Sequence, residues 1–92
     1  MRSTDPRLAS WIREYTPGLL GVARAFAAGE DEAEDLLQEV WITAWRKADE
    51  RPAGMPLGAW LHRVALNVGR TRRRRRLRRE RLRAYWRPGA PA

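Results

Sequence analysis

The sequence of 92 residues contains no cysteine, one histidine and one lysine. Without cysteine, neither a disulfide nor a thiolate metal site can stabilise the chain. The lone His62 has no second ligand to pair with, so we interpret it as a surface residue and expect neither a metal nor a cofactor. No apolar run approaches the ~18 residues that span a bilayer, and a signal-peptide pattern is missing. These absences predict a cytoplasmic protein without membrane insertion.

The residue patterns of enzymes are missing as well. The sequence has no Ser-His-Asp order, no glycine-rich phosphate loop and no spaced carboxylate pair in an apolar setting. The acidic cluster from Glu30 to Asp35 lacks the glycine and the alternating spacing of a calcium loop. We interpret this cluster as the negative first turn of a helix, which the helix dipole favours. The sequence therefore predicts a protein that is not an enzyme.

Charge is divided between the two halves of the chain. Residues 1–50 carry six Lys or Arg against ten Asp or Glu, a balance of −4, whereas residues 51–92 carry thirteen Arg against the single Glu80, a balance of +12. Such a division predicts two partners of opposite sign, most simply a basic protein surface for the first half and nucleic acid for the second.

Hydrophobic periodicity predicts an all-α fold, a small bundle of three to four helices. We expect one kinked helix or two abutting helices over 6–28, because cap-plus-proline signals occur at Asp5-Pro6 and again at Thr16-Pro17. A second helix runs to about Lys47, and residues 48–58, with two Pro and two Gly, form an irregular loop. A third helix begins near Leu57, with core contacts ending near Val68.

The region after Val68 is basic and almost without apolar residues. Ten of the fourteen residues from 70 to 83 are Arg, and they surround the helix, so we expect this extension to be ordered mainly when it is bound to phosphate. The predicted domain spans residues 1–83, and residues 84–92 form a flexible tail or the start of a linker.

The helix that contains Ala33 has an unusual polar face. Its core stripe is formed by Ala33, Leu36, Leu37, Val40, Trp41 and Ala44. The opposite face carries Asp35, Gln38, Glu39 and Ile42, with Trp45 at its margin. An Ile among carboxylates and an amide indicates either a docking surface or a solvated acidic face with one stray apolar residue. Trp45 fits the edge of the core and a partner contact equally well.

The third helix carries a basic flank opposite its core stripe. Arg63, Asn67, Arg70 and Arg74 lie within about 60° of arc on this flank. Arginine binds phosphates and sets register, while the Asn67 amide offers a donor and an acceptor to a base edge. Trp60 is a core residue that could leave one ring face for stacking.

Two ordered motifs resemble region 2 of bacterial RNA polymerase sigma factors of the compact extracytoplasmic-function class. The first motif is Ala33-Glu34-Asp35-Leu36-Leu37-Gln38-Glu39, with Trp45 closing the helix. The second is Trp60-Leu61-His62-Arg63-Val64-Ala65-Leu66-Asn67, followed by arginine clusters. The likeness covers roughly residues 6–80 and implies a bacterial protein with the helical fold of that region.

The resemblance implies two binding surfaces. The helix of Asp35 would dock on the clamp helices of the polymerase β′ subunit, and the loop over 48–58 would cradle a base flipped out of the promoter minus-ten element, on the non-template strand. The polymerase-binding candidates are Asp35, Gln38, Glu39, Ile42 and Trp45. The DNA-binding candidates are Trp60, Arg63, Asn67, Arg70, Arg73 and Arg74. The specificity-loop candidates are Arg51, Gly54 and Met55.

Departures from the family pattern leave some questions open. Leu57 replaces a common aromatic residue and Thr71 replaces a common acid, so the base preference is not fixed. We expect no region 4 domain in this sequence, because nothing after Arg83 could form its helix-turn-helix. The sequence would then be either one domain of a longer factor or a natural single-domain factor. The family also implies an anti-sigma factor as a possible partner, although no residue identifies one. The alternative is a nonspecific Arg-rich nucleic-acid-binding protein with a steep salt dependence. A membrane-surface anchor has too few apolar residues.

Overall fold

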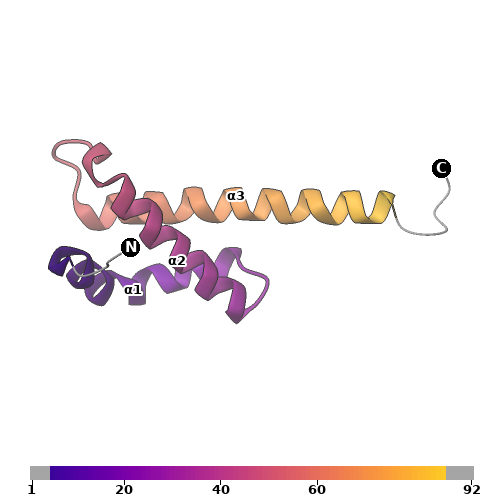
Figure 1. The fold of residues 1–92 in the computed structure, drawn as a ribbon, viewed down its shortest axis with the longest axis horizontal. Helices are drawn as coiled ribbons and strands as arrows, with labels where there is room; N and C mark the ends of the chain where they lie inside the picture. Colours follow the sequence, from indigo (N-terminus) through magenta and orange to yellow (C-terminus); the bar gives the residue numbers. More distant parts are fainter. Residues whose placement is uncertain (1–4, 87–92) are drawn as a thin grey trace.

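The computed structural model describes residues 5–86 of the chain. This range folds into three α-helices, α1 (Pro6–Phe26), α2 (Glu30–Arg46) and α3 (Leu57–Tyr85), with a short 3-10 turn, η1 (Ala48–Glu50), between α2 and α3. No strand occurs within it. The predicted all-α bundle is confirmed. Figure 1 shows α1, α2 and the first half of α3 packed together, while the second half of α3 projects away from them.

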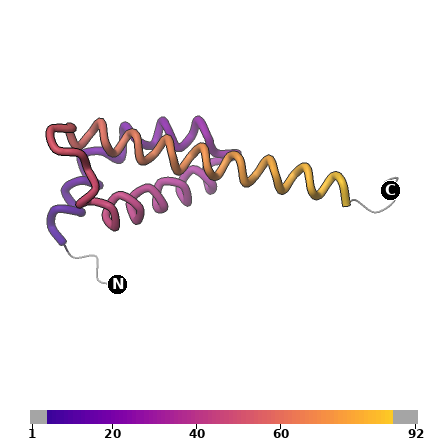
Figure 2. Tube along the Cα trace, turned by 90° about the horizontal axis from the view of Figure 1, so that it is seen from above, coloured from indigo at the N-terminus to yellow at the C-terminus, as the bar shows by residue number. Residues whose placement is uncertain are grey.

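Helix α1 begins where the cap signal predicts and continues through an internal proline. The Asp5 carboxylate accepts a hydrogen bond of 2.8 Å from the backbone N–H of Arg7, and Pro6 occupies the first turn, where its missing N–H is not needed. Pro17 lies inside the helix. Because proline removes one backbone hydrogen bond, the helix bends, and Figure 2 shows its two parts running in different directions. Of the two predicted alternatives, one kinked helix or two abutting helices, the structure has the single kinked helix.

The core of the bundle is built from one stripe of each helix. Five of the six residues of the predicted α2 stripe are buried, and Leu37 packs half-buried against them. The fully buried side chains with the largest volumes are Leu36, Leu61 and Val40. This packing fixes α2 with its polar face outward, because one side of the helix is fully engaged by its neighbours.

The close crossing of α1 and α3 depends on a glycine. A Cβ atom added to Gly69 would lie 2.6 Å from Cδ2 of Phe26, the last residue of α1. Gly69 is buried, so the core extends just beyond the predicted limit at Val68. Glycine at this position lets the end of α1 pack directly on the backbone of α3.

The prediction of an irregular segment over 48–58 is wrong at both ends. The N–H of Glu50 donates to the carbonyl of Lys47 at 2.9 Å, which closes the 3-10 turn before the first proline of the loop. At the other end, Pro56 precedes α3, and Leu57 and Gly58 belong to the helix. Only the middle is irregular, with Gly54 at a φ of 84°, a conformation that glycine adopts without strain.

Residues 70–83 belong to helix α3, and the expectation that phosphate stabilises this stretch stays a prediction. Helix α3 continues without interruption to Tyr85, beyond the predicted boundary at 83. Two ion pairs with α2, described below, anchor the beginning of this basic stretch. The rest of the predicted tail, residues 87–92, lies outside the described residues. No helix in the part that the structure describes is long and apolar enough to cross a membrane.

Candidate protein-docking and nucleic-acid interfaces

The outward face of α2 combines polar side chains with one exposed apolar residue. Asp35 and Gln38 are exposed, and 60% of the surface of Ile42 is accessible. The buried stripe on the other side of α2 holds these residues in place. A rigid face of this kind can bind another protein, because an apolar centre with a polar rim is typical of interfaces.

Glu39 belongs to this predicted face but has a partner within the chain. The Arg72 guanidinium Nε donates to Glu39 Oε1 at 2.6 Å, and the two side chains are 28% and 37% exposed. The helical wheel of α2 alone cannot reveal this pair, because its other half comes from α3. The pair leaves Asp35 as the unpaired carboxylate of the face among the described residues.

Trp45 lies at the junction of α1 and α2. Its ring packs edge-on against Trp11, with 5.5 Å between the ring centroids, and the Arg7 guanidinium lies 5.3 Å from the ring centre. Trp45 is half-buried at the edge of the core. Of the two interpretations left open by the sequence, the structure supports the core margin, and a partner contact by the exposed part of the ring remains a prediction.

A pocket of about 240 Å³ lies where the end of α2, the loop and α3 meet. Three predicted DNA-binding residues, Trp60, Arg63 and Asn67, line it together. Trp60 is only 5% exposed and forms part of a wall, while Arg63 and Asn67 are exposed. The remaining lining residues are Thr43, Lys47, Glu50, Pro52, Val64 and Val68. The pocket is smaller than a typical drug-sized site and suits a single planar group such as a base.

The loop residues at this pocket differ from those predicted. Glu50 and Pro52 line the pocket, whereas the predicted specificity residues do not. Arg51 donates through Nη1 to the carbonyl oxygen of Met55 at 2.6 Å, and Met55 packs partly buried against the core. These two residues, with the turn at Gly54, hold the shape of the loop.

Two further pocket residues, Thr43 and Lys47, were missed by the sequence interpretation. They are one helical turn apart at the end of α2, directly before the loop. Their four-residue spacing places both on the flank of α2 that faces the loop, so helical periodicity could have predicted them as pocket residues. Lys47 and Arg63 bring two cations to the pocket against the single carboxylate of Glu50, so the pocket favours a ligand with negative charge at its mouth.

The other predicted DNA-binding residues lie farther along α3. Arg70, Arg73 and Arg74 are exposed, and Arg74 lines a second groove on the basic part of the helix. Within residues 5–86 no group of three or more His, Cys, Asp or Glu is arranged to hold a metal ion.

The junction between α1 and α2 is reinforced by an ion pair. Arg24 donates two hydrogen bonds to the Glu30 carboxylate, at 3.1 and 2.8 Å. The hydrogen bonds from Arg24 lower the pKa of the Glu30 carboxyl below its ordinary value. The pair bridges the last turn of α1 and the first turn of α2, and it lines neither the pocket nor the groove.

The chain is similar to known proteins over most of its length. The family model of Sigma-70 region 2 matches residues 11–80. RNA polymerase sigma factor CnrH from Cupriavidus metallidurans is 35% identical over 56 residues, which cover 61% of this chain and 29% of that protein. RNA polymerase sigma factor NccH from Alcaligenes xylosoxydans xylosoxydans is 31% identical over 63 residues, which cover 68% of this chain and 34% of that protein. The matched part of the chain thus spans about a third of the length of these relatives. No solved structure matches the chain significantly.

Proposed function

Since this chain belongs to the Sigma-70 region 2 family, we propose that it acts in transcription initiation through two separate surfaces. The polar face of α2 docks on the clamp helices of the RNA polymerase β′ subunit. The pocket beside Trp60 captures a base of the melted minus-ten element. The observation that carries the proposal is the convergence of Trp60, Arg63 and Asn67 on one base-sized pocket.

The pocket has the chemistry that strand capture requires. A base that leaves the duplex loses its stacking and needs a new surface to rest on, and the small exposed parts of Trp60, Val64 and Val68 form the apolar floor of this open pocket. The Asn67 amide can pair with a base edge, and Lys47 and Arg63 can neutralise the adjacent phosphates. Each captured base contributes about 1–3 kcal/mol, so a few of them help to hold a promoter open.

The docking face has a charge suited to a basic partner. Asp35 supplies an exposed carboxylate, Gln38 an amide, and Ile42 an apolar centre. Complementary charge across an interface speeds association and selects partners. The ion pair with Arg72 uses Oε1 of Glu39, which leaves Oε2 for a polymerase contact.

Binding to core polymerase, or to an isolated β′ clamp-helix fragment, tests the docking half of the proposal. The wild-type chain and the double variant Asp35→Ala/Gln38→Ala are compared in a pull-down at moderate salt. Glu14→Ala removes the same charge from an exposed position on α1 and is the control. We expect the wild type and the control to bind and the double variant to lose binding. Equal binding by all three would contradict the proposed docking face.

Binding of single-stranded minus-ten oligonucleotides tests the pocket. Asn67→Ala should weaken this binding by about 1–3 kcal/mol, because a base edge loses its paired donor and acceptor. His62→Ala changes an exposed residue of α3 that does not line the pocket, so its affinity should stay at the wild-type value. Polymerase binding should be the same in both variants. Identical strand affinity in the two variants would remove Asn67 from the site.

The alternative of a nonspecific nucleic-acid-binding protein is favoured by the many exposed arginines of α3. It predicts equal affinity for all DNA and RNA sequences, and it predicts that Asp35→Ala/Gln38→Ala leaves nucleic-acid binding unchanged. The polymerase pull-down above distinguishes it from the sigma-factor proposal.

A further inference from the structure

Exposed apolar residues gather at the end of α3. Six large hydrophobic residues of the described range are exposed, and four of them lie in residues 77–86: Leu77, Leu82, Tyr85 and Trp86. The last side chain of α3 that is hydrogen-bonded to the other helices is Arg76, which donates to Glu32 Oε1 at 2.6 Å and to the Phe26 carbonyl at 3.0 Å. Beyond it the helix projects from the bundle in both views (Figures 1 and 2). These side chains are therefore no part of the core, and exposed apolar patches among polar residues mark interaction sites.

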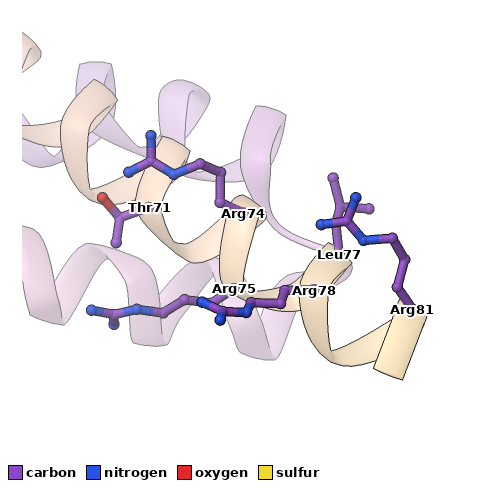
Figure 3. Close-up of a pocket in the computed structure, with 6 residues that line it drawn as sticks. All are labelled: Thr71, Arg74, Arg75, Leu77, Arg78 and Arg81. Atoms are coloured by element: carbon purple, nitrogen blue, oxygen red, sulfur yellow. The ribbon is translucent and has the colours of Figure 1, made fainter. Parts of the chain in front are cut away.

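Three of the four share one side of the helix. Leu82, Tyr85 and Trp86 are three and four residues apart, which places their side chains next to one another. The two aromatic rings pack edge-on, with 5.2 Å between their centroids. These three residues form the apolar patch of α3. Leu77 lies about 140° around the helix from Leu82, where it lines a separate groove among arginines (Figure 3).

The apolar patch continues the stripe of α3 that faces α2. The residues of this stripe follow one another at alternating spacings of four and three: Val68, Arg72, Arg75, Arg79, Leu82 and Trp86. Val68 is buried in the core, and Arg72 pairs with Glu39 of α2 at 2.6 Å. The next two arginines line a pocket of about 230 Å³ together with Glu32 and Glu39. The apolar patch lies on the same stripe, past the last α3 residue that lines this pocket.

The contacts with α2 show which chemistry this stripe of α3 accepts. Helix α2 is amphipathic, with a buried apolar stripe and with carboxylates, Glu32 and Glu39, that pair with arginines of α3. The arginines around the apolar patch form no ion pair within the described residues. Two of them flank the patch and two precede it by one turn: Arg81, Arg83, Arg78 and Arg79. The lone acid of this segment, Glu80, lies about 160° from Leu82 around the helix. An acidic partner would therefore fit the patch.

We propose that the apolar patch of α3 binds an acidic amphipathic helix of a partner protein. The apolar stripe of the partner packs on Leu82 and Trp86, and its flanking Asp or Glu residues pair with the surrounding arginines. Coiled-coil helices meet in this way, with an apolar seam between charged residues that select the partner. Leu82, Tyr85 and Trp86 lie outside residues 11–80, the range that the family model matches. The site therefore does not depend on the docking face of α2 or on the minus-ten pocket.

Two other occupants fit the apolar patch less well. A phosphate backbone pairs with arginines but offers nothing apolar to Leu82. A second copy of the chain carries the same net charge of +8, so the two copies repel each other. An acidic amphipathic helix satisfies both the apolar side chains and the arginines.

Binding of a synthetic helix to the whole chain tests this site. The probe is a fluorescent peptide of about three heptads with Leu at positions a and d and Glu at e and g, whose own charge opposes its self-association. Leu82→Ala/Trp86→Ala removes the apolar contacts, and alanine keeps the helix. The double variant should bind the peptide about tenfold more weakly or worse, because a few large anchors carry most of the energy of an interface. Fluorescence anisotropy measures the affinity.

Two controls separate apolar packing from charge. Ile12→Ala/Ile42→Ala removes two exposed apolar side chains from α1 and α2, and its affinity for the peptide should equal that of the wild type. A second peptide has Ser in place of every Leu and keeps all of its Glu residues. It should bind the wild-type chain about tenfold more weakly than the first peptide, since it has no apolar stripe.

Three results would overturn the proposal. The first is equal affinity of the wild type and Leu82→Ala/Trp86→Ala for the leucine peptide. The second is equal affinity of the wild type for the two peptides, because charge alone would then explain the binding. The third is self-association of the wild-type chain in sedimentation experiments that Leu82→Ala/Trp86→Ala abolishes, because the occupant of the patch would then be a second copy.

Discussion

Helix α2 and the projecting half of α3 are both rich in charge, but they are held in different ways. Helix α2 buries apolar side chains at each of its turns from Ala33 to Ala44. After Gly69, α3 buries none, and its attachment to the bundle consists of the Arg72 and Arg76 side chains. One charged surface therefore rests on a packed core, while the other rests on its own backbone hydrogen bonds and two ion pairs.

This difference indicates what each surface is suited for. A face fixed by core packing is preorganised, so little conformational entropy is lost when a protein partner binds it. A projecting helix of like charges is destabilised by its own repulsion and is stabilised by a polyanion. The chain thus combines a rigid acidic surface with a basic helix whose stability depends on its ligand.

The largest expected effect separates the two halves of α3 directly. Leu61→Ala should lower the free energy of unfolding by about 2–5 kcal/mol, because Leu61 is fully buried and its loss leaves a cavity. Leu77→Ala, at a position 45% exposed on the projecting half, should change it by less than about 0.5 kcal/mol. Urea unfolding measures the free energy of unfolding of both variants. Similar losses in the two variants would mean that the projecting half is packed like the bundle.

The next effect tests the point where core packing ends. Gly69→Ala should destabilise the fold by about 1–3 kcal/mol, because its Cβ would overlap the ring of Phe26. Gly21→Ala is the matched control, since a Cβ there meets nothing within 4 Å, and alanine should stabilise α1 by about 0.5–1 kcal/mol. Thermal unfolding shows whether each substitution lowers or raises the stability. Stabilisation in both variants would show that Phe26 can move aside easily.

A smaller effect tests the ionic attachment of α3. Glu32→Gln should lower stability by about 1 kcal/mol, because Arg76 loses a charged acceptor while the glutamine oxygen still reaches the Ala28 N–H. Amide hydrogen exchange should accelerate most near Arg76. Glu34→Gln changes an exposed acid without such a pair and is the control. Equal exchange in both variants would show that the ion pair does not anchor the helix.

The smallest effect is the pH dependence of the Arg24–Glu30 pair. The pKa of Glu30 is lower in the folded chain, so its stabilisation is present above the unfolded pKa and is lost as pH falls through the folded pKa. The thermal midpoints of the wild type and Glu30→Gln should differ slightly at pH 7 and converge in acid. If the difference between the two thermal midpoints grew in acid, the predicted pH dependence of the ion pair would be contradicted.

The bundle was accessible to sequence reasoning because its signals are local. The stripe from Ala33 to Ala44 repeats at helical spacing, and Asp5-Pro6 is a self-contained cap. The flank of Arg63 and Asn67 follows from the same periodicity, and the pocket includes both. Positions fixed by one helix were thus predicted with the correct orientation.

The missed features depend on pairs of residues that are distant in the chain. Arg72 meets Glu39 across 33 residues, and Arg76 meets Glu32 across 44, so the wheel of α3 gave no sign that its basic half is anchored. Within the loop, Arg51 donates to the Met55 carbonyl oxygen instead of lining the pocket, a contact that the residue pattern does not reveal. Such contacts are set by tertiary packing and leave no periodic signal.

The affinity of three chains for core RNA polymerase tests most directly the claim that the two charged surfaces serve different partners. The chains are the wild type, Asp35→Ala/Gln38→Ala and Arg78→Gln/Arg81→Gln, measured without DNA. The account predicts that the α2 variant loses polymerase binding and that the α3 variant binds as tightly as the wild type. Retained binding by the α2 variant, or equal losses in both variants, would contradict it.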